Sequence, residues 1–237
     1  MTALPATAFY ARAPLYLAGL LGLAVLGFYR SYFARFFGAD LVHHLHGLTA
    51  TGWLVLLCTQ AWLYRTRRLA LHRQLGRVSP LLVALFLVSG VLVLRRMLTA
   101  QDGFSQAYGM RLSFVDATSV AYFALAFGLA LHWRRRLQTH ARLMVSTALL
   151  VLPPALARAA GQYIPGIHNF EGAFHAGFVA SELMVAGLIV HDLRHGGWRW
   201  PYPVLLALML LQQWSFHAVP HWSWWQAWMG QLAGAAG

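Results

Sequence analysis

The chain of 237 residues is too apolar for an ordinary soluble protein, because 59% of its residues are hydrophobic and only 10% are charged, where soluble domains average about 25% charged. Its formal net charge of +12 would suit a nucleic-acid partner, but every basic residue is an Arg in a short segment between long apolar runs. Such placement is typical of a membrane surface and excludes nucleic acid. We therefore expect an integral membrane protein with lipid as its immediate partner.

The apolar runs predict an all-α fold, a polytopic bundle of seven transmembrane helices in one transmembrane domain over residues 1–237. Several runs are near the roughly 20 residues that a helix needs to cross the hydrocarbon core. The expected spans are 13–30, 42–64, 77–97, 113–133, 142–160, 171–191 and 202–219. Pro153 and Pro154 should break or kink the fifth span. A Trp-rich tail at 221–230 is expected to lie in the membrane interface.

The distribution of Arg predicts the orientation of these spans. The loops on one side carry twelve Arg and the loops on the other side carry six. Because cytoplasmic loops are enriched in basic residues, the side with twelve should be cytoplasmic, with the N-terminus inside and the C-terminus outside. We expect a multi-pass protein of a bacterial inner membrane. Cys58 is the only cysteine, so any haem would be held non-covalently.

A polar stripe opens the sixth expected span. Glu171, His175 and Glu182 share one face of a helix, because positions four and eleven apart lie on the same side. Glu182 should lie near mid-bilayer, and an ionisable side chain at that depth is normally functional. We expect Glu171 and Glu182 to be metal ligands or proton carriers. Asp116 is the other deep acid, and it is expected to carry protons, to orient a ligand His, or simply to pair with Arg111.

Histidines cluster on the side with fewer Arg. In the second span, His46, Trp53 and Gln60 are spaced by seven and share a face. Neutral imidazole ligates Zn, Cu, Fe and haem iron, and carboxylates add oxygen ligands. We predict His46 and His175 as the central ligands of a site. The other candidate metal ligands at similar depth are His43, His168 and His217. For His43 the alternative is a solvated side chain at the level of the lipid head groups.

A second pair of histidines lies on the Arg-rich side, within a weak internal repeat. Residues 62–73 end in His72-Arg73 and residues 131–142 end in His140-Ala141-Arg142, each after an Arg cluster and at the start of a span. Equivalent positions in related helices would supply both axial ligands of one haem. The alternatives are that His72 and His140 bind lipid phosphate together with the neighbouring Arg, or cap the preceding loop.

These segments resemble known families. His46-Gly47 with Trp53 and Gln60, followed by Leu71-His72-Arg73, resembles a pattern in uncharacterised bacterial multi-span membrane proteins, and residues 139–158 look like a second block of it. The scheme is more distantly similar to di-haem cytochrome b membrane proteins of the ascorbate-reducible type, where four core helices bind two haems through His pairs, one near each membrane face. The resemblance implies that His72 and His140 ligate the inner haem. The outer pair departs from it, because the fourth span offers Asp116 instead of a His.

The leading hypothesis is a membrane redox protein that holds haem b or a transition metal ion (Fe, Cu or Zn); if it is an enzyme, it would be a membrane oxidoreductase. Its electron partners would be quinone, another membrane carrier or a small reductant, with Trp53 and Gln60 supporting the cofactor-binding histidines. Three alternatives stay open: a proton-coupled transporter that uses Glu182 and Asp116, a metal-dependent membrane lipid hydrolase, and an accessory subunit of a larger complex or an oligomer. No nucleotide-binding or hydrolase motif narrows this choice.

Overall fold

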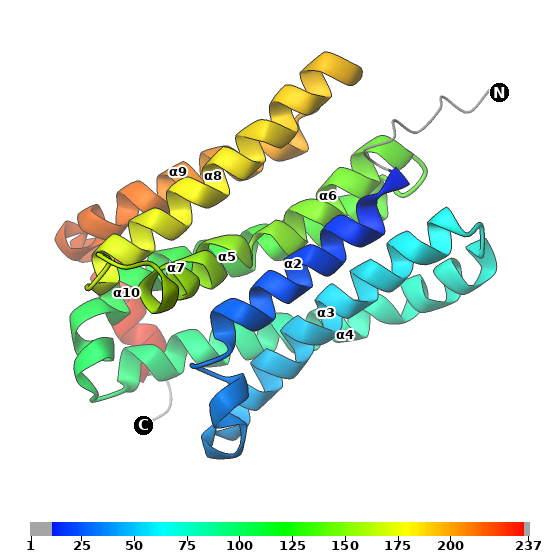
Figure 1. Cartoon of the computed structure of the whole chain (residues 1–237). Helices are drawn as coiled ribbons and strands as arrows, with labels where there is room; N and C mark the ends of the chain where they lie inside the picture. Colours follow the sequence, from blue (N-terminus) through cyan, green and yellow to red (C-terminus); the bar gives the residue numbers. More distant parts are fainter. Residues whose placement is uncertain (1–10, 235–237) are drawn as a thin grey trace.

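The computed structural model describes residues 11–234, which form antiparallel helices without a strand (Figure 1). Apolar composition over long uninterrupted runs accounts for their length. In chain order they are α2 (Ala13–Phe28), α3 (Leu41–Arg65), α4 (Leu69–Thr99), α5 (Gly103–His132), α6 (Leu137–Leu149), α7 (Leu152–Tyr163), α8 (Phe170–His195), α9 (Pro201–Ala218) and α10 (Ser223–Gly234). Two short 3-10 turns, η1 (Phe33–Gly38) and η2 (Val219–His221), precede α3 and α10.

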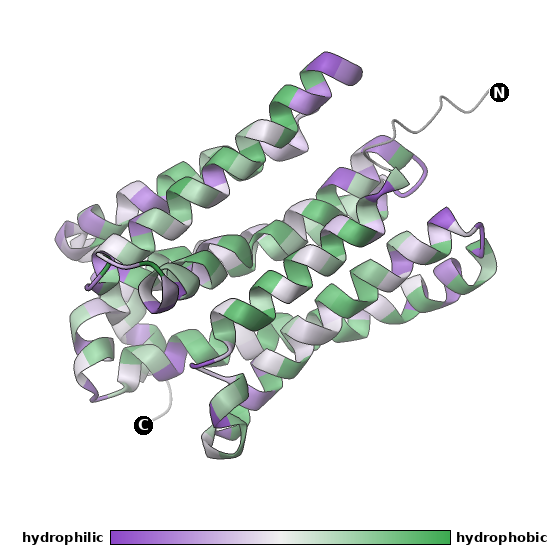
Figure 2. Ribbon diagram, in the orientation of Figure 1, coloured by the Kyte–Doolittle hydropathy of each residue, from purple (hydrophilic) through white to green (hydrophobic). Residues whose placement is uncertain are grey.

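Within residues 11–234, five segments are long and apolar enough to cross a membrane: α3, α4, α5, α8, and α6 with α7 taken together as Leu137–Tyr163. Hydrophobic residues cover the helices along most of their length, and hydrophilic residues gather at the turns (Figure 2). The prediction of a helical membrane protein is confirmed at this level. The first and last expected spans also form helices, α2 and α9, but neither is among these five segments. Seven crossings and the orientation of the termini therefore stay predictions.

The turns between helices separate the two ends of the bundle. The turns at 66–68, 133–136 and 196–200 lie together at one end (Figure 1), and we call this the Arg-rich end. The opposite end, which we call the η1 end, carries η1, η2 and the loops that join α4 to α5 and α7 to α8. The two groups of histidines thus lie at different ends, as the sequence predicts.

Four helices form a ring at the centre of the molecule. Each of α3, α4, α5 and α6 packs against the next, and α6 packs back against α3. Because α4 and α6 do not pack closely along each other, they lie diagonally across the ring, and the same holds for α3 and α5. Around this ring, α2 packs on α3 and α7, α8 packs on α7 and α9, and α9 packs on α5 and α6.

The fifth expected span is broken, as its two prolines predict. α6 ends at Leu149 and α7 begins at Leu152, so that Pro153 and Pro154 lie in the first turn of α7. Proline there lacks the N–H that a continuous helix would use, and its ring blocks the preceding turn. The short helix α7 then packs closely between α2 and α8.

Close packing of α8 on α7 depends on Gly177. A Cβ at this position would lie 2.5 Å from the Ala157 nitrogen and 2.7 Å from the Pro153 oxygen, both main-chain atoms of α7. These contacts leave no room for a side chain. A glycine in a helix allows the close approach either of a flat cofactor or of another helix, and at Gly177 the structure shows helix packing.

Replacing Gly177 with Ala should destabilise the protein by about 1–3 kcal/mol, because the added methyl group forces the α7 and α8 backbones apart. Gly187 of the same helix is the matched control, since nothing lies within 4 Å of its missing Cβ. Gly187→Ala should be neutral or stabilising, because Ala favours a helix over Gly. Thermal unfolding in detergent, followed by Trp fluorescence, measures both variants. Equal unfolding temperatures for the two would contradict this account.

A buried ion pair joins α6 to α8 near the Arg-rich end. The Arg142 Nε and a terminal guanidinium nitrogen donate to the two oxygens of Asp192 at 2.6 and 2.7 Å, and both side chains are almost fully buried, with 5% and 4% exposed. Arg142 also donates to the main-chain oxygen and Oε1 of Gln138. The alternative in which Arg142 binds lipid phosphate beside His140 is therefore wrong, because Asp192 already pairs with this guanidinium.

The Trp-rich tail folds as α10 and docks on the bundle. Trp225 is buried, and its Nε1 donates to the Ser113 Oγ of α5 at 2.8 Å. Its ring also packs edge-on against Phe114. Trp224 and Trp228 remain exposed, in agreement with an interfacial position for the outer face of this helix.

Candidate cofactor and proton sites

His72 is clamped to the preceding helix at the Arg-rich end. Its Nδ1 lies 3.2 Å from the main-chain oxygen of Gln60, and the Gln60 side chain donates its Nε2 to the main-chain oxygen of His72 at 3.1 Å. These reciprocal hydrogen bonds tie the first turn of α4 to the last turns of α3. The Gln60 Oε1 is buried and has no hydrogen-bond partner.

His140 makes an equivalent Nδ1 hydrogen bond in the second half of the repeat. Its Nδ1 lies 2.8 Å from the main-chain oxygen of Ala130, in the preceding helix α5. A carbonyl oxygen only accepts, so Nδ1 must carry the proton in both His72 and His140. Each imidazole therefore has its Nε2 lone pair available, which is the state that an axial ligand of haem requires.

The two imidazoles belong to the same end of the ring. His72 begins α4 and His140 begins α6, which are the diagonal pair of helices. Two available Nε2 atoms on diagonal helices at one end of a bundle can serve as the two axial ligands of one planar cofactor between them.

Trp53 lies deeper in the same ring and supports its packing. It is 3% exposed, and its Nε1 donates to the Thr147 Oγ1 of α6 at 3.1 Å. Its ring packs against Phe123 and Phe127 of α5. Trp53 therefore joins α3 to α5 and α6 and forms an apolar wall inside the ring.

His46 lies near the η1 end and is bound within its own helix pair. Its Nδ1 is 3.1 Å from the Ser89 Oγ of α4, and its ring stacks on Phe86. The structure does not bring His46 to His175, with which the sequence analysis pairs it. Ser89 was missed, since it is 43 residues away and has no sequence signal beyond its polar character.

His43 and His168 are both exposed at the η1 end. The His43 side chain and main-chain nitrogen both contact the Oδ1 of Asp40, the N-cap of α3, at 2.8 and 3.0 Å. The hydrogen bond from the His43 main chain lowers the pKa of the Asp40 carboxyl to about 2, and Arg96 pairs with the other oxygen. His168 lies in the loop before α8 and makes no hydrogen bond or ion pair with the described residues.

The deep acids do not share one site. Arg111 of α5 pairs with Glu171 at 2.6 Å, so the alternative that Asp116 pairs with Arg111 is wrong. The Arg158 guanidinium of α7 lies over the Phe28 ring of α2. Glu182 has its Oε1 buried without a hydrogen-bond partner.

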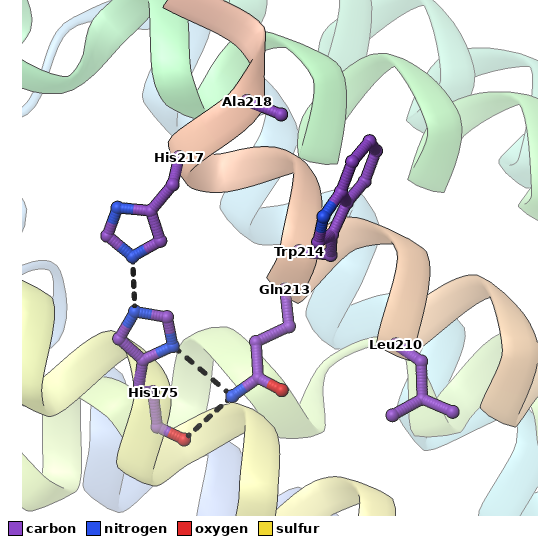
Figure 3. Close-up of a pocket in the computed structure, with 6 residues that line it drawn as sticks. All are labelled: His175, Leu210, Gln213, Trp214, His217 and Ala218. Carbon is purple, nitrogen blue, oxygen red and sulfur yellow. Dashed lines mark hydrogen bonds between the residues drawn. The ribbon is translucent and has the colours of Figure 1, made fainter.

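His175 and His217 meet across the α8–α9 interface (Figure 3). Their Nε2 atoms are 2.9 Å apart, and the Gln213 Nε2 lies 3.2 Å from the His175 Nδ1. The pair borders an open groove of about 570 Å³, whose other lining residues include Leu210, Trp214 and Ala218. Because His217 is exposed, the pair is accessible from this groove.

The histidines predicted as metal ligands do not gather into one site. Within residues 11–234, no group of three or more His, Cys, Asp or Glu side chains is arranged to hold a metal ion. Direct contact within the predicted set joins His175 to His217. The predicted set comprises His43, His46, His168, His175 and His217.

Comparison of the chain with protein-family models, curated proteins and solved structures found no match. The resemblance to di-haem cytochromes b therefore stays an expectation. Function has to be inferred from the geometry of the described side chains.

Proposed function

We propose that the chain is a membrane electron carrier that holds a b-type haem between His72 and His140. The observation that carries this proposal is the shared tautomer of the two imidazoles. Each Nδ1–H donates to a main-chain carbonyl of the preceding helix, at 3.2 and 2.8 Å. Each Nε2 is then available and held in a fixed direction, as a ligand histidine normally is.

Other features of the Arg-rich end support the same proposal. The Gln60 Oε1 is a buried acceptor without a partner beside His72, and such atoms normally have a hydrogen-bond donor, which a bound group or its water would supply. Arg73 and Arg77 are exposed on the first turns of α4. Their guanidinium groups suit the propionates of a haem, because Arg pairs well with carboxylates.

Bound haem would supply a one-electron redox centre. The chain would hold the two ligands, exclude lipid through the Trp53 wall and provide positive charge at the surface. The expected electron partners are quinone, another membrane carrier or a small reductant. We further propose seven crossings in a bacterial inner membrane, with the Arg-rich end facing the cytoplasm.

An absorption spectrum and an elemental analysis of one purified sample test the proposal. The protein, produced in cells that make haem, should show a Soret band, sharp reduced bands typical of two axial histidines, and one iron per chain. A colourless protein without stoichiometric iron, which also fails to take up added haem, would rule it out.

A proton-coupled transporter is the second candidate function, and Glu182 favours it. This carboxyl group has a buried oxygen without a partner in a helix apolar enough to cross a membrane. An intramembrane acid of this kind is typical of a proton carrier. Proton-driven uptake into proteoliposomes that is lost in Glu182→Gln would support this function. Uptake that survives the substitution would argue against Glu182 as the carrier.

A further inference from the structure

We propose that the His175–His217 pair transfers protons between water at the η1 end and Glu182 in the interior of α8. This is a separate activity from haem binding at the Arg-rich end. It would serve an electron carrier that takes up protons and a transporter alike. The support comes from the alignment of the two rings, the position of Glu182 and the shape of the groove.

The two imidazoles are aligned for a direct N–H···N hydrogen bond. The Nε2 atoms are 2.9 Å apart, the ring planes differ by 11°, and the centroids are 5.1 Å apart. This centroid distance is close to the nitrogen separation plus the two ring radii, so the nitrogens point at each other. A metal ion would need to lie about 2.0–2.1 Å from both nitrogens, with their lone pairs converging to one side. The observed alignment instead suits a shared proton.

Gln213 defines which nitrogens carry protons. Its Nε2 donates to the His175 Nδ1, so the proton of neutral His175 lies on Nε2. The His175 Nε2–H then donates to the His217 Nε2, which leaves the His217 proton on Nδ1. The pair is a directed chain from Gln213 to the exposed edge of His217.

For each proton that enters the His175–His217 pair, one proton leaves it. A proton arriving at the His175 Nδ1 makes an imidazolium, while the Gln213 amide turns so that its Oε1 accepts. The proton on the His175 Nε2 passes to the His217 Nε2, and His217 releases its Nδ1 proton to water. Rotation of the two rings or reverse transfer restores the starting tautomers.

Glu182 is the inner partner by position. It follows His175 by seven residues, so it lies on the same face of α8, about 10 Å deeper. The groove runs along α9 from His217 to Leu210, and this seven-residue spacing covers a similar distance in the antiparallel direction. Glu182 does not itself line the groove, so water would have to join its carboxyl to the groove and to the His175 Nδ1. A charged carboxylate without a partner is costly at this depth, so we expect Glu182 to hold its proton at rest.

The charged side chains nearest to the His175–His217 pair have partners other than these two histidines. Glu171 lies one turn before His175 on α8, but Arg111 of α5 pairs with Glu171. Arg158 of α7 lies over Phe28 of α2. His221 of η2 follows on the chain after α9 and has an exposed side chain.

Proton transfer to Glu182 can be timed in the full-length protein by infrared spectroscopy. The protein in nanodiscs is first equilibrated at high pH, and a light-released acid then lowers the pH of the surrounding buffer. The carboxylic C=O band that is absent in Glu182→Gln reports on the protonation of Glu182. The band should appear at least ~100-fold more slowly in His175→Phe and His217→Ala, the lower end of the contribution of a positioned proton-transfer group. His221→Ala is the matched control and should keep the rate of the unaltered chain.

Added imidazole distinguishes proton transfer from a structural role. The groove beside His217 is open, so free imidazole should restore most of the rate in His217→Ala. It should leave His221→Ala unchanged. Unaltered rates in both His175→Phe and His217→Ala would overturn the proposal, as would slow rates in His217→Ala that imidazole does not restore. Using His72→Ala as the background makes the result independent of haem.

Discussion

Replacing either His72 or His140 with Ala should remove haem from the protein. Each supplies an Nε2 whose direction is held by a hydrogen bond to a carbonyl of the preceding helix. Loss of a supporting partner of a metal ligand already costs ~10–100-fold in affinity, so loss of the ligand itself should lower haem content at least ~10-fold. The Soret absorbance per chain measures this in protein purified from haem-producing cells.

His132 provides the matched control for this experiment. It lies at the same end, in the last turn of α5, and its side chain is exposed. His132→Ala should keep both the Soret band and the iron content. A protein in which His72→Ala and His140→Ala retain full haem, with unchanged reduced bands, would place the haem elsewhere and contradict the assignment.

Removing one member of the Arg142–Asp192 pair should destabilise the protein by about 3–5 kcal/mol. Both side chains are almost fully buried, and the group left behind would be an uncompensated charge in a low-dielectric interior. Arg142→Ala and Asp192→Ala should each unfold at a much lower temperature or fail to accumulate. Replacing both residues together, as Arg142→Met with Asp192→Leu, should cost far less, because no unpaired charge remains.

The Arg111–Glu171 pair is the matched comparison. Its side chains are 32% and 41% exposed, and exposed pairs typically contribute about 0.2–1 kcal/mol. Arg111→Ala should therefore change the unfolding temperature only slightly. Thermal unfolding in one detergent, with Trp fluorescence as the signal, compares all of these variants. Similar losses for Arg111→Ala and Arg142→Ala would show that burial does not set the contribution of these pairs.

Several structural features were predictable from the sequence because they depend on local properties of the chain. Apolar run length placed the helices, and the missing N–H of proline placed the break between α6 and α7. Helical periodicity put Glu171, His175 and Glu182 on one helix, and the Arg-cluster repeat singled out His72 and His140. These signals can be recognised within single segments of the chain or by comparing two segments, so no tertiary information is needed to interpret them.

The pairing of the site residues was decided by tertiary structure alone. Of His46 and His217, which were both expected near His175, the structure brings His217 into contact with it, and Asp192, which was not considered, binds Arg142. Periodicity shows which side chains share a face of one helix, but it does not show how neighbouring helices are ordered and rotated. Those follow from many weak contacts, such as Gly177 against the α7 backbone, which sum over the whole bundle.

The histidine tautomers show the same difference between what the sequence predicts and what helix packing decides. The sequence by itself determined that His72 and His140 each begin a helix after an Arg cluster. It could not indicate that the Gln60 and Ala130 carbonyls accept from their Nδ1 atoms, because every residue has a carbonyl group and none is distinguished by residue type. Only the packing of α4 on α3 and of α6 on α5 decides which oxygen lies within hydrogen-bonding distance, and with it which ring nitrogen remains available to a cofactor.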